Sequence, residues 1–192
     1  SRSAAMMLGY RQLYAELLRN RVTLTARHIG TTANVIADDL SRAQDPTEFG
    51  VSVELRLRAE QQLHLQCQVD RFASALHHQP LPFETRYGCL EAHRVDTFTG
   101  VWTLPSWLTP PLALLVGVLI KLESDKARAL LLAPVWPAAL WYPRLLALAK
   151  HSMPVPHLAT HLTRHPNNRS PPEYLRNPAW NFRIYLIDGS AA

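Results

Sequence analysis

The sequence predicts an α/β protein, and three observations support that class. Apolar residues make up 47% of the 192 residues and charged residues 18%, a composition that can bury a core. Segments with strand-like and helix-like patterns follow one another in the order strand, loop, helix, strand, helix. After residue 153 prolines punctuate a polar and basic sequence, which predicts an extended C-terminal tail.

The N-terminal part of the chain is expected to form a helix, a strand and a second helix. Apolar residues recur at helical spacing over residues 6–20, with charged residues on the other side. Residues 22–29 alternate between aliphatic and polar side chains, as in a short strand. A loop of small residues follows, and Asn34 is a suitable N-cap for a helix over 34–41. These elements form the first expected unit, residues 1–45.

The α/β core is expected over residues 46–150. Its first half begins with a helix of mixed periodicity over 46–66, followed by an apolar strand at 68–73. Two prolines make residues 76–86 a loop. β-Branched residues then predict a short strand at 95–98.

The second half of the core begins after a double proline, Pro110-Pro111. A helix is expected over 112–122, because the prolines end the preceding element and a long aliphatic segment follows. A buried aliphatic strand is expected at 129–133, and helical periodicity returns at 141–149.

The third expected unit is the tail, residues 151–192. Its prolines hinder a compact fold, and its arginines and histidines suit contact with an RNA backbone or a protein groove. Alternation at 182–187 predicts one strand that could add to another element.

Charge and cysteine usage restrict the class of partner and the compartment. The net charge is +5 and the isoelectric point about 9.6, which favours polyanionic partners. Cys67 and Cys89 have no CxxC spacing, so neither a disulfide framework nor a zinc site of the usual pattern is expected. We expect two free thiols and an intracellular, reducing compartment. The clean apolar run at 112–120 is too short to span a bilayer, so no membrane insertion is expected.

Several segments together resemble one family. Residues 28–42, HIGTTANVIADDLSR, resemble the end of the ribonuclease H domain in polymerases of DIRS-type (tyrosine-recombinase) retrotransposons. The segments at 69–84 (VDRFASALHHQPLPFE), 95–102 (VDTFTGVW) and 110–148 resemble, in the same order, the block that follows that domain. The resemblance covers about residues 8–150 and implies a retroelement-derived chain that opens with part of a ribonuclease H-like element.

The ribonuclease H resemblance implies specific roles for two residues. Asp38 matches the last of the four carboxylates that hold two Mg²⁺ ions, and His28 matches a loop histidine that assists product release. One carboxylate cannot hold two divalent cations, because Mg²⁺ requires several converging oxygen ligands. The other three carboxylates lie upstream in the family and have no match in this chain. We therefore expect no cofactor, with Mg²⁺ bound only if missing domains complete the site.

The central block also resembles adenine-specific DNA methyltransferases. Asp70 close to a strand and the tetrapeptide Thr109-Pro110-Pro111-Leu112 correspond to the acidic residue and the base-binding motif of those enzymes. Thr109 is a poor acceptor for the target amine, and Leu112 cannot stack a base as an aromatic ring does. No glycine-rich loop follows Asp70. The resemblance therefore implies a small Rossmann-like, degenerate methyltransferase-like core used as a scaffold.

The expected function is a non-catalytic subunit that binds nucleic acid, as RNA or RNA–DNA hybrid, or that serves as a structural component of a larger assembly with other protein chains. One alternative is a polymerase fragment that acts on hybrid only beside its missing upstream domains, and another is a DNA adenine methyltransferase-like enzyme. No metal site is expected, because the histidines lack companion ligands, and the tryptophans are expected in the core. The residues expected to contact nucleic acid are Arg27, Arg42, Arg144, Lys150, Arg164, Arg169 and Arg176.

Overall fold

The computed structural model describes residues 11, 13–25, 49–74, 77–86, 90–163, 173–177 and 179–191. The chain divides into two compact units, residues 1–44 and residues 45–192. Each unit is described separately below.

The first unit contains one described helix. Residues 13–19 are helical, within the helix predicted over 6–20. Residues 22–25 belong to no strand, so the strand predicted at 22–29 is not formed in its described half. The helix predicted at 34–41 lies outside the described residues.

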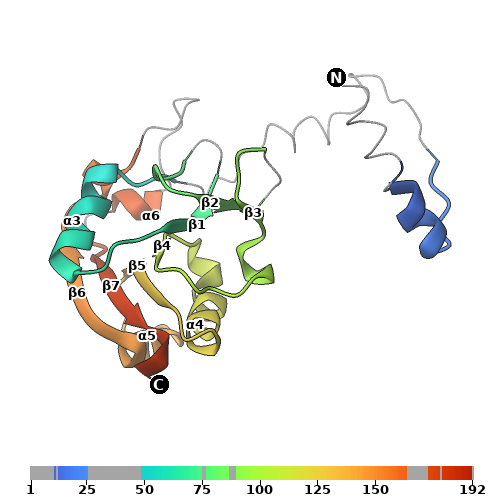
Figure 1. The fold of residues 1–192 in the computed structure, drawn as a ribbon. Coiled ribbons are helices and arrows are strands. Elements are labelled where there is room, and N and C mark those ends of the chain that lie inside the picture. Colours follow the sequence, from blue (N-terminus) through green and yellow to red (C-terminus); the bar gives the residue numbers. More distant parts are fainter. Residues whose placement is uncertain are drawn as a thin grey trace. The chain divides into compact units, whose positions relative to one another are not determined.

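The second unit is built on one seven-stranded sheet with the strand order β3-β2-β1-β4-β5-β7-β6 (Figure 1). The neighbours from β3 to β5 are parallel, whereas β7 is antiparallel to both β5 and β6. The α/β class is therefore confirmed. The strands are β1 (Val69–Ala73), β2 (Phe83–Thr85), β3 (Arg94–Val95), β4 (Ser106–Leu108), β5 (Arg128–Pro134), β6 (Ala149–Val155) and β7 (Phe182–Asp188).

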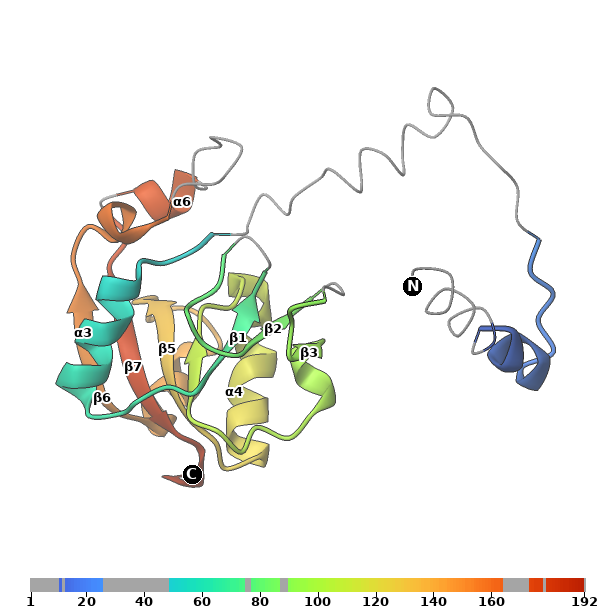
Figure 2. The same cartoon turned by 45° about the horizontal axis from the view of Figure 1, so that its top comes forward.

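Helix α3 (Val53–Leu63) lies over β6 and β7 on one face of the sheet (Figure 2). The Ser52 hydroxyl accepts a hydrogen bond from the Leu55 N–H at 3.3 Å and so caps the N-terminus. The helix ends at His64, which adopts a left-handed conformation with φ of 53°. The predicted helix over 46–66 is therefore confirmed, with a later start at the serine cap.

The core on the α3 side is formed by the buried stripe of that helix and by the side chains that the central strands direct toward it. These residues include Leu55, Ala59, Leu63, Trp107, Leu130, Leu132, Met153, Val155, Phe182, Ile184 and Leu186.

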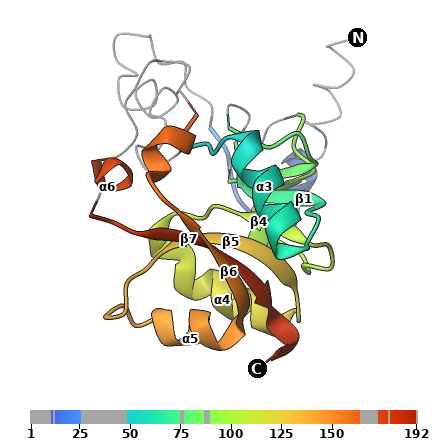
Figure 3. The same ribbon diagram turned by 90° about the vertical axis from the view of Figure 1, so that its left-hand side faces the viewer.

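Helices α4 (Leu115–Ser124) and α5 (Tyr142–Leu148) cover the opposite face of the sheet (Figure 3). A 3-10 turn at Leu112–Leu114 leads from the double proline into α4, so both predicted helices are confirmed. None of the helices in the described ranges is long and apolar enough to cross a membrane. The core on this side includes Trp102, Leu108, Leu115, Val118, Leu119, Leu122, Ala129, Leu131, Ala133, Leu145, Leu148, Tyr185 and Ile187.

Strand β5 has an unbroken aliphatic sequence because both of its faces are buried. Leu130 and Leu132 contribute to the core on the α3 side. Ala129, Leu131 and Ala133 contribute to the core under α4 and α5. Such a run is typical of a central strand covered by helices on both faces.

Within the described part of residues 151–192, the strand predicted at 182–187 is confirmed as β7, and the sheet strands β6 and β7 stand where an extended tail was expected. Strand β7 lies between β5 and β6 and pairs along its whole length with β5, from Phe182 beside Pro134 to Asp188 beside Arg128. A 3-10 turn (Leu158–His161) and helix α6 (Glu173–Arg176) precede it. The prolines misled the prediction because Pro154 lies in an edge strand, where a missing N–H is tolerated.

The strands β2 and β4 were not predicted. Each is three residues long, too short to give a periodic signal, and β2 falls in the predicted loop at 76–86. The strand predicted at 95–98 is reduced to the two residues of β3, and a 3-10 turn over Thr97–Thr99 follows. Residues 74–82 join β1 to β2, and the described part of this connection contains no helix. A parallel crossover usually takes a dozen residues or more.

Candidate functional site

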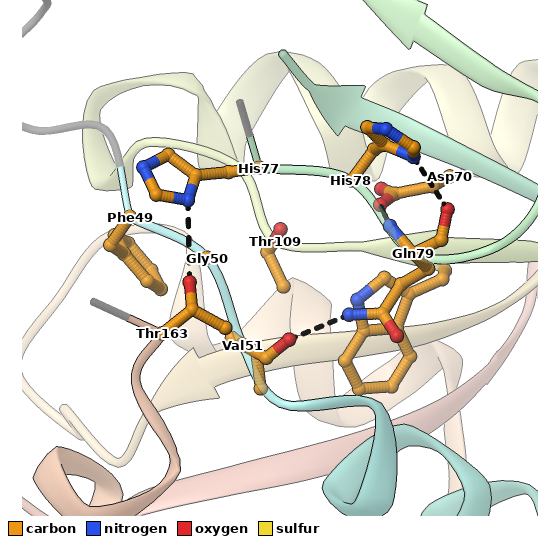
Figure 4. A pocket seen from close by; sticks show the side chains of 10 residues that line it. Phe49, Gly50, Val51, Asp70, His77, His78, Gln79, Thr109 and Thr163 are labelled. Atoms are coloured by element: carbon orange, nitrogen blue, oxygen red, sulfur yellow. Dashed lines mark hydrogen bonds between the residues drawn. The ribbon is translucent and has the colours of Figure 1, made fainter. Parts of the chain in front are cut away.

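A small pocket lies between Asp70, the second residue of β1, and Thr109, which follows β4, close to where the strand order reverses. In doubly wound sheets this crevice is where ligands bind. The pocket has a volume of about 100 Å³. It is lined by Phe49, Gly50, Val51, Asp70, His77, His78, Gln79, Trp107, Thr109 and Thr163 (Figure 4).

Asp70 supplies the only carboxylate among these lining residues, and it is 3% exposed. Its Oδ2 atom accepts a hydrogen bond from the Gln79 N–H at 3.0 Å, and the Phe72 N–H also stabilises the carboxylate, whereas Oδ1 forms no hydrogen bond of standard geometry within the described residues. Burial raises the pKa of Asp70 from an ordinary value of 3.8 to about 6, although the Gln79 N–H opposes the rise. Strand β1 therefore places at the pocket a carboxyl group whose charged form is destabilised by burial.

The Gln79 side chain fixes the loop from which the Gln79 backbone N–H donates to Asp70. Its Nε2 donates to the Val51 carbonyl at 2.7 Å, and its Oε1 accepts from Arg56 Nε at 3.1 Å. Arg56 is in turn paired with Glu60 at 2.6 Å, one turn along α3. Helix α3 thus positions the loop after β1 through Arg56, which donates hydrogen bonds to both Gln79 and Glu60.

Glu60 also closes the turn that follows α3. Its Oε1 accepts a hydrogen bond from the Cys67 N–H at 2.9 Å. The Cys67 thiol is free and buried, as predicted, and its burial raises its pKa. Cys89 lies outside the described residues.

Two imidazoles form the rim of the pocket. His78 Nδ1 lies 2.9 Å from the Gln79 carbonyl oxygen, so this nitrogen carries the proton that is donated, and the ring stacks on Phe83 with centroids 4.2 Å apart. His77 Nδ1 lies 3.3 Å from the Thr163 hydroxyl. No group of three His, Cys, Asp or Glu side chains among the described residues could hold a metal ion.

The opposite rim joins two segments that are far apart in the sequence. The Gly50 carbonyl accepts a hydrogen bond from the Thr163 N–H at 3.0 Å, and Val51 forms an isolated β-bridge with Leu162. A Cβ on Gly50 would collide with the Thr163 hydroxyl and lie 2.9 Å from His77 Nδ1. The side chains of Thr163 and His77 approach the Gly50 backbone so closely that a larger residue would fit only if they moved.

The tetrapeptide Thr109-Pro110-Pro111-Leu112 immediately follows β4. Thr109 lines the pocket, as the methyltransferase resemblance implies for its position. Leu112 instead packs against the core beneath α4 and does not line the pocket. The two ends of the motif are therefore separated, and no aromatic ring takes the place of the leucine.

A second polar cluster lies within the sheet on the α4 side. Arg71 Nη1 pairs with Glu84 Oε1 at 2.8 Å, and the side chains are 3% and 2% exposed. Arg71 Nε also donates to Ser106 Oγ at 2.7 Å, and its guanidinium lies 5.1 Å from the centre of the Trp102 ring. Thr97 donates to the other Glu84 oxygen at 2.6 Å. This cluster ties β1, β2 and β4 together and is closed to ligands.

The tryptophans divide into core and surface residues. Trp102 and Trp107 are fully buried, as predicted. Trp136, Trp141 and Trp180 are half-buried; Trp141 and Trp180 pack against the two core clusters, so the expectation of a core position is confirmed in part for Trp141 and is wrong for Trp136. Trp136 contacts Trp180 edge-to-face at 4.8 Å and lies 6.3 Å from Trp141, centre to centre. We call these three residues the indole cluster; it follows the end of β5 and precedes β7.

The three predicted nucleic-acid contacts that fall within the described residues lie on separate elements. Arg144 is exposed on α5 and pairs with Glu123 through Nε at 3.0 Å. Lys150 is exposed near the start of β6. It lies at the opposite end of the strands from the indole cluster, because β6 starts where β7 ends. Arg176 is exposed at the end of α6, four residues before Trp180. Outside the described residues lie Arg27, His28, Asp38, Arg42, Arg164 and Arg169.

Sequence reasoning singled out Asp70 and Thr109 only as positions of a degenerate methyltransferase-like motif, and it missed the residues that enclose them. Gln79, Gly50 and Thr163 reach the pocket through contacts between distant segments, which no local pattern reveals. The chain matches no protein-family model, and no curated protein shows significant sequence similarity to it.

Proposed function

We propose that the chain is a non-catalytic, retroelement-derived component of a larger assembly, and that it associates with single-stranded nucleic acid. In this proposal the second unit is a reduced methyltransferase-like layer that serves as a scaffold. The DIRS-type resemblance of residues 28–42 and 69–148 supports the retroelement origin.

The strand order supports the methyltransferase-like part of the proposal. The order 3-2-1-4-5 is that of the doubly wound dinucleotide-binding sheets, which bind ligands outside the carboxyl ends of β1 and β4. Asp70 and Thr109 lie beside that crevice, as the resemblance implies for an acid and a base-binding motif.

The small volume of the pocket supports the non-catalytic role that we propose for the chain. A pocket for a nucleoside-sized ligand usually measures about 300–1,000 Å³, whereas this one measures about 100 Å³. The connection from β1 to β2 contains no glycine that would let a cofactor approach the backbone. Thr109 and Leu112 also replace the amine-binding and stacking groups of the motif.

The indole cluster is the single observation that carries the nucleic-acid part of the proposal. Three half-buried indoles gather at the carboxyl edge of the sheet in a chain with a net charge of +5. Indole rings beside basic groups stack the bases of single strands without sequence preference, at about 1–3 kcal/mol per base. Arg176 is the exposed cation nearest in sequence to Trp180 among the described residues.

The test is a binding titration of fluorescein-labelled single-stranded RNA with the purified full chain, followed by anisotropy. Trp136→Ala should weaken the affinity about fivefold to a hundredfold, because one stacked base is lost. Leu146→Ala is the matched control, since it removes an exposed apolar side chain of α5 outside the cluster. Equal affinities for the Trp136→Ala variant and the parent chain would rule out a stacking role, and no binding by the parent chain would reject the proposal.

A DNA adenine methyltransferase-like enzyme is the second candidate. It is favoured by the buried Asp70 carboxylate, whose Oδ1 lacks a donor among the described residues beside the ligand crevice. Transfer of a labelled methyl group from a methyl donor to adenine in DNA would establish this candidate in place of the first.

A further inference from the structure

We propose that the pocket beside Asp70 binds a primary ammonium group, contributed by a small free amine or by the end of a lysine side chain. This inference concerns the pocket alone. It does not depend on the nucleic-acid proposal, which rests on the indole cluster.

The first argument is the missing donor. The Asp70 side chain lines the pocket and is 3% exposed, and its Oδ1 atom forms no hydrogen bond of standard geometry within the described residues, although the nearby Phe72 N–H lowers the pKa of the carboxyl group. A buried acceptor without a donor is destabilising, so a donor supplied from outside should bind there. Figure 4 shows the Asp70 carboxylate close to Gln79, which engages only the second carboxylate oxygen.

The second argument is that the neighbouring cations are already engaged. The Arg56 guanidinium donates to Gln79 and to Glu60. His78 Nδ1 is occupied by the Gln79 carbonyl oxygen. The charge of the Asp70 carboxylate is therefore not neutralised by a direct ion pair with any described residue, and a bound cation would supply that pair.

The third argument is the match of size and lining. A volume of about 100 Å³ admits a group of a few heavy atoms and excludes a nucleoside-bearing ligand. The Thr109 hydroxyl offers a further acceptor, and the Trp107 and Phe49 rings offer apolar walls for the methylene groups beside the nitrogen. A divalent metal ion suits the pocket less well, because one carboxylate supplies few of the oxygen ligands that such ions require.

Protonation should control this binding. Asp70 loses its charge as the pH falls through about 6, and affinity for the ammonium group should fall with it. The other titratable or charged groups around the carboxylate are Arg56, Glu60, His77 and His78.

The experiment follows the amide resonance of Gln79 in the ¹⁵N-labelled full chain during titration with methylammonium chloride at pH 7.5. The Gln79 N–H bonds to Asp70 and therefore reports on its environment. We expect a saturable shift, at least tenfold weaker for Asp70→Asn and for tetramethylammonium, which has no N–H donor. Glu91→Gln is the matched control, because it removes an exposed carboxylate and should leave the affinity unchanged.

A second titration with Nα-acetyl-lysinamide separates the two sources of the ammonium group. Affinity equal to or above that of methylammonium would support a lysine side chain, and affinity more than tenfold lower would support a small free amine. The inference is overturned if methylammonium gives no saturable shift, if sodium chloride gives the same shift, or if Asp70→Asn binds as tightly as the parent chain.

Discussion

Replacing Asp70 by asparagine should stabilise the protein at neutral pH. Asparagine has nearly the same shape and retains an oxygen for the Gln79 N–H, but it carries no charge. The carboxylate is 3% exposed and has one oxygen without a donor in the described part of the chain, so the charged form is poorly solvated. Removing that charge should raise the free energy of unfolding.

The magnitude follows from the pKa of Asp70. The folded chain raises this pKa from 3.8 to about 6. Because one pKa unit corresponds to about 1.4 kcal/mol, the rise corresponds to about 3 kcal/mol of destabilisation. The folded state binds the proton more tightly than the unfolded state, so the parent chain loses stability as the pH rises from about 4 to about 6. An asparagine amide without an acceptor would offset about 1 kcal/mol, leaving an expected gain of about 2 kcal/mol above pH 7.

Urea denaturation at pH 4.5 and pH 7.5 measures this difference by linear extrapolation. The gain for Asp70→Asn should be large at pH 7.5 and should shrink at pH 4.5, where the parent carboxyl is protonated. Glu91→Gln, which changes an exposed carboxylate, should show no such pH dependence. A variant that is less stable than the parent at pH 7.5, or a gain equal at both pH values, would refute the reasoning, since it would mean that the charge is well solvated or paired.

Two further substitutions test the framework around the pocket. Glu84→Gln removes the partner of the buried Arg71 guanidinium and should lower the free energy of unfolding by about 3–5 kcal/mol in urea denaturation, whereas an effect below about 1 kcal/mol would show that water reaches the pair. Gly50→Ala places a methyl group against Thr163 and His77 and should lower it by about 1–3 kcal/mol through overpacking; an unchanged thermal midpoint would show that this rim is mobile.

The fold was predictable where one segment carries its own signal. Strand β5 and helix α4 have long aliphatic sequences, because both are packed against the core. Strands β2 and β4 were missed because three residues show no period. Pro154 and the basic residues around it suggested a tail, yet backbone pairing with β7 and burial of Met153 and Val155 override that local preference.

The candidate site was predictable only in part, for a related reason. Asp70 and Thr109 could be identified because they belong to short motifs near strand ends. Gln79 became visible only through its hydrogen bond to Val51, 28 residues away in the sequence. The contact between His77 and Thr163 spans 86 residues and is likewise invisible to any local pattern. Enclosure of a pocket is a property of the tertiary fold.

The insertion of β7 between two earlier strands has a consequence for biosynthesis. While the ribosome has not yet released residues 182–188, β6 has no neighbour in the sheet and β5 exposes one whole side of its backbone. Completion of this sheet is therefore a late, long-range event, and nascent chains should be vulnerable to edge-to-edge aggregation until then. A chaperone that shields β5 during translation would relieve this vulnerability.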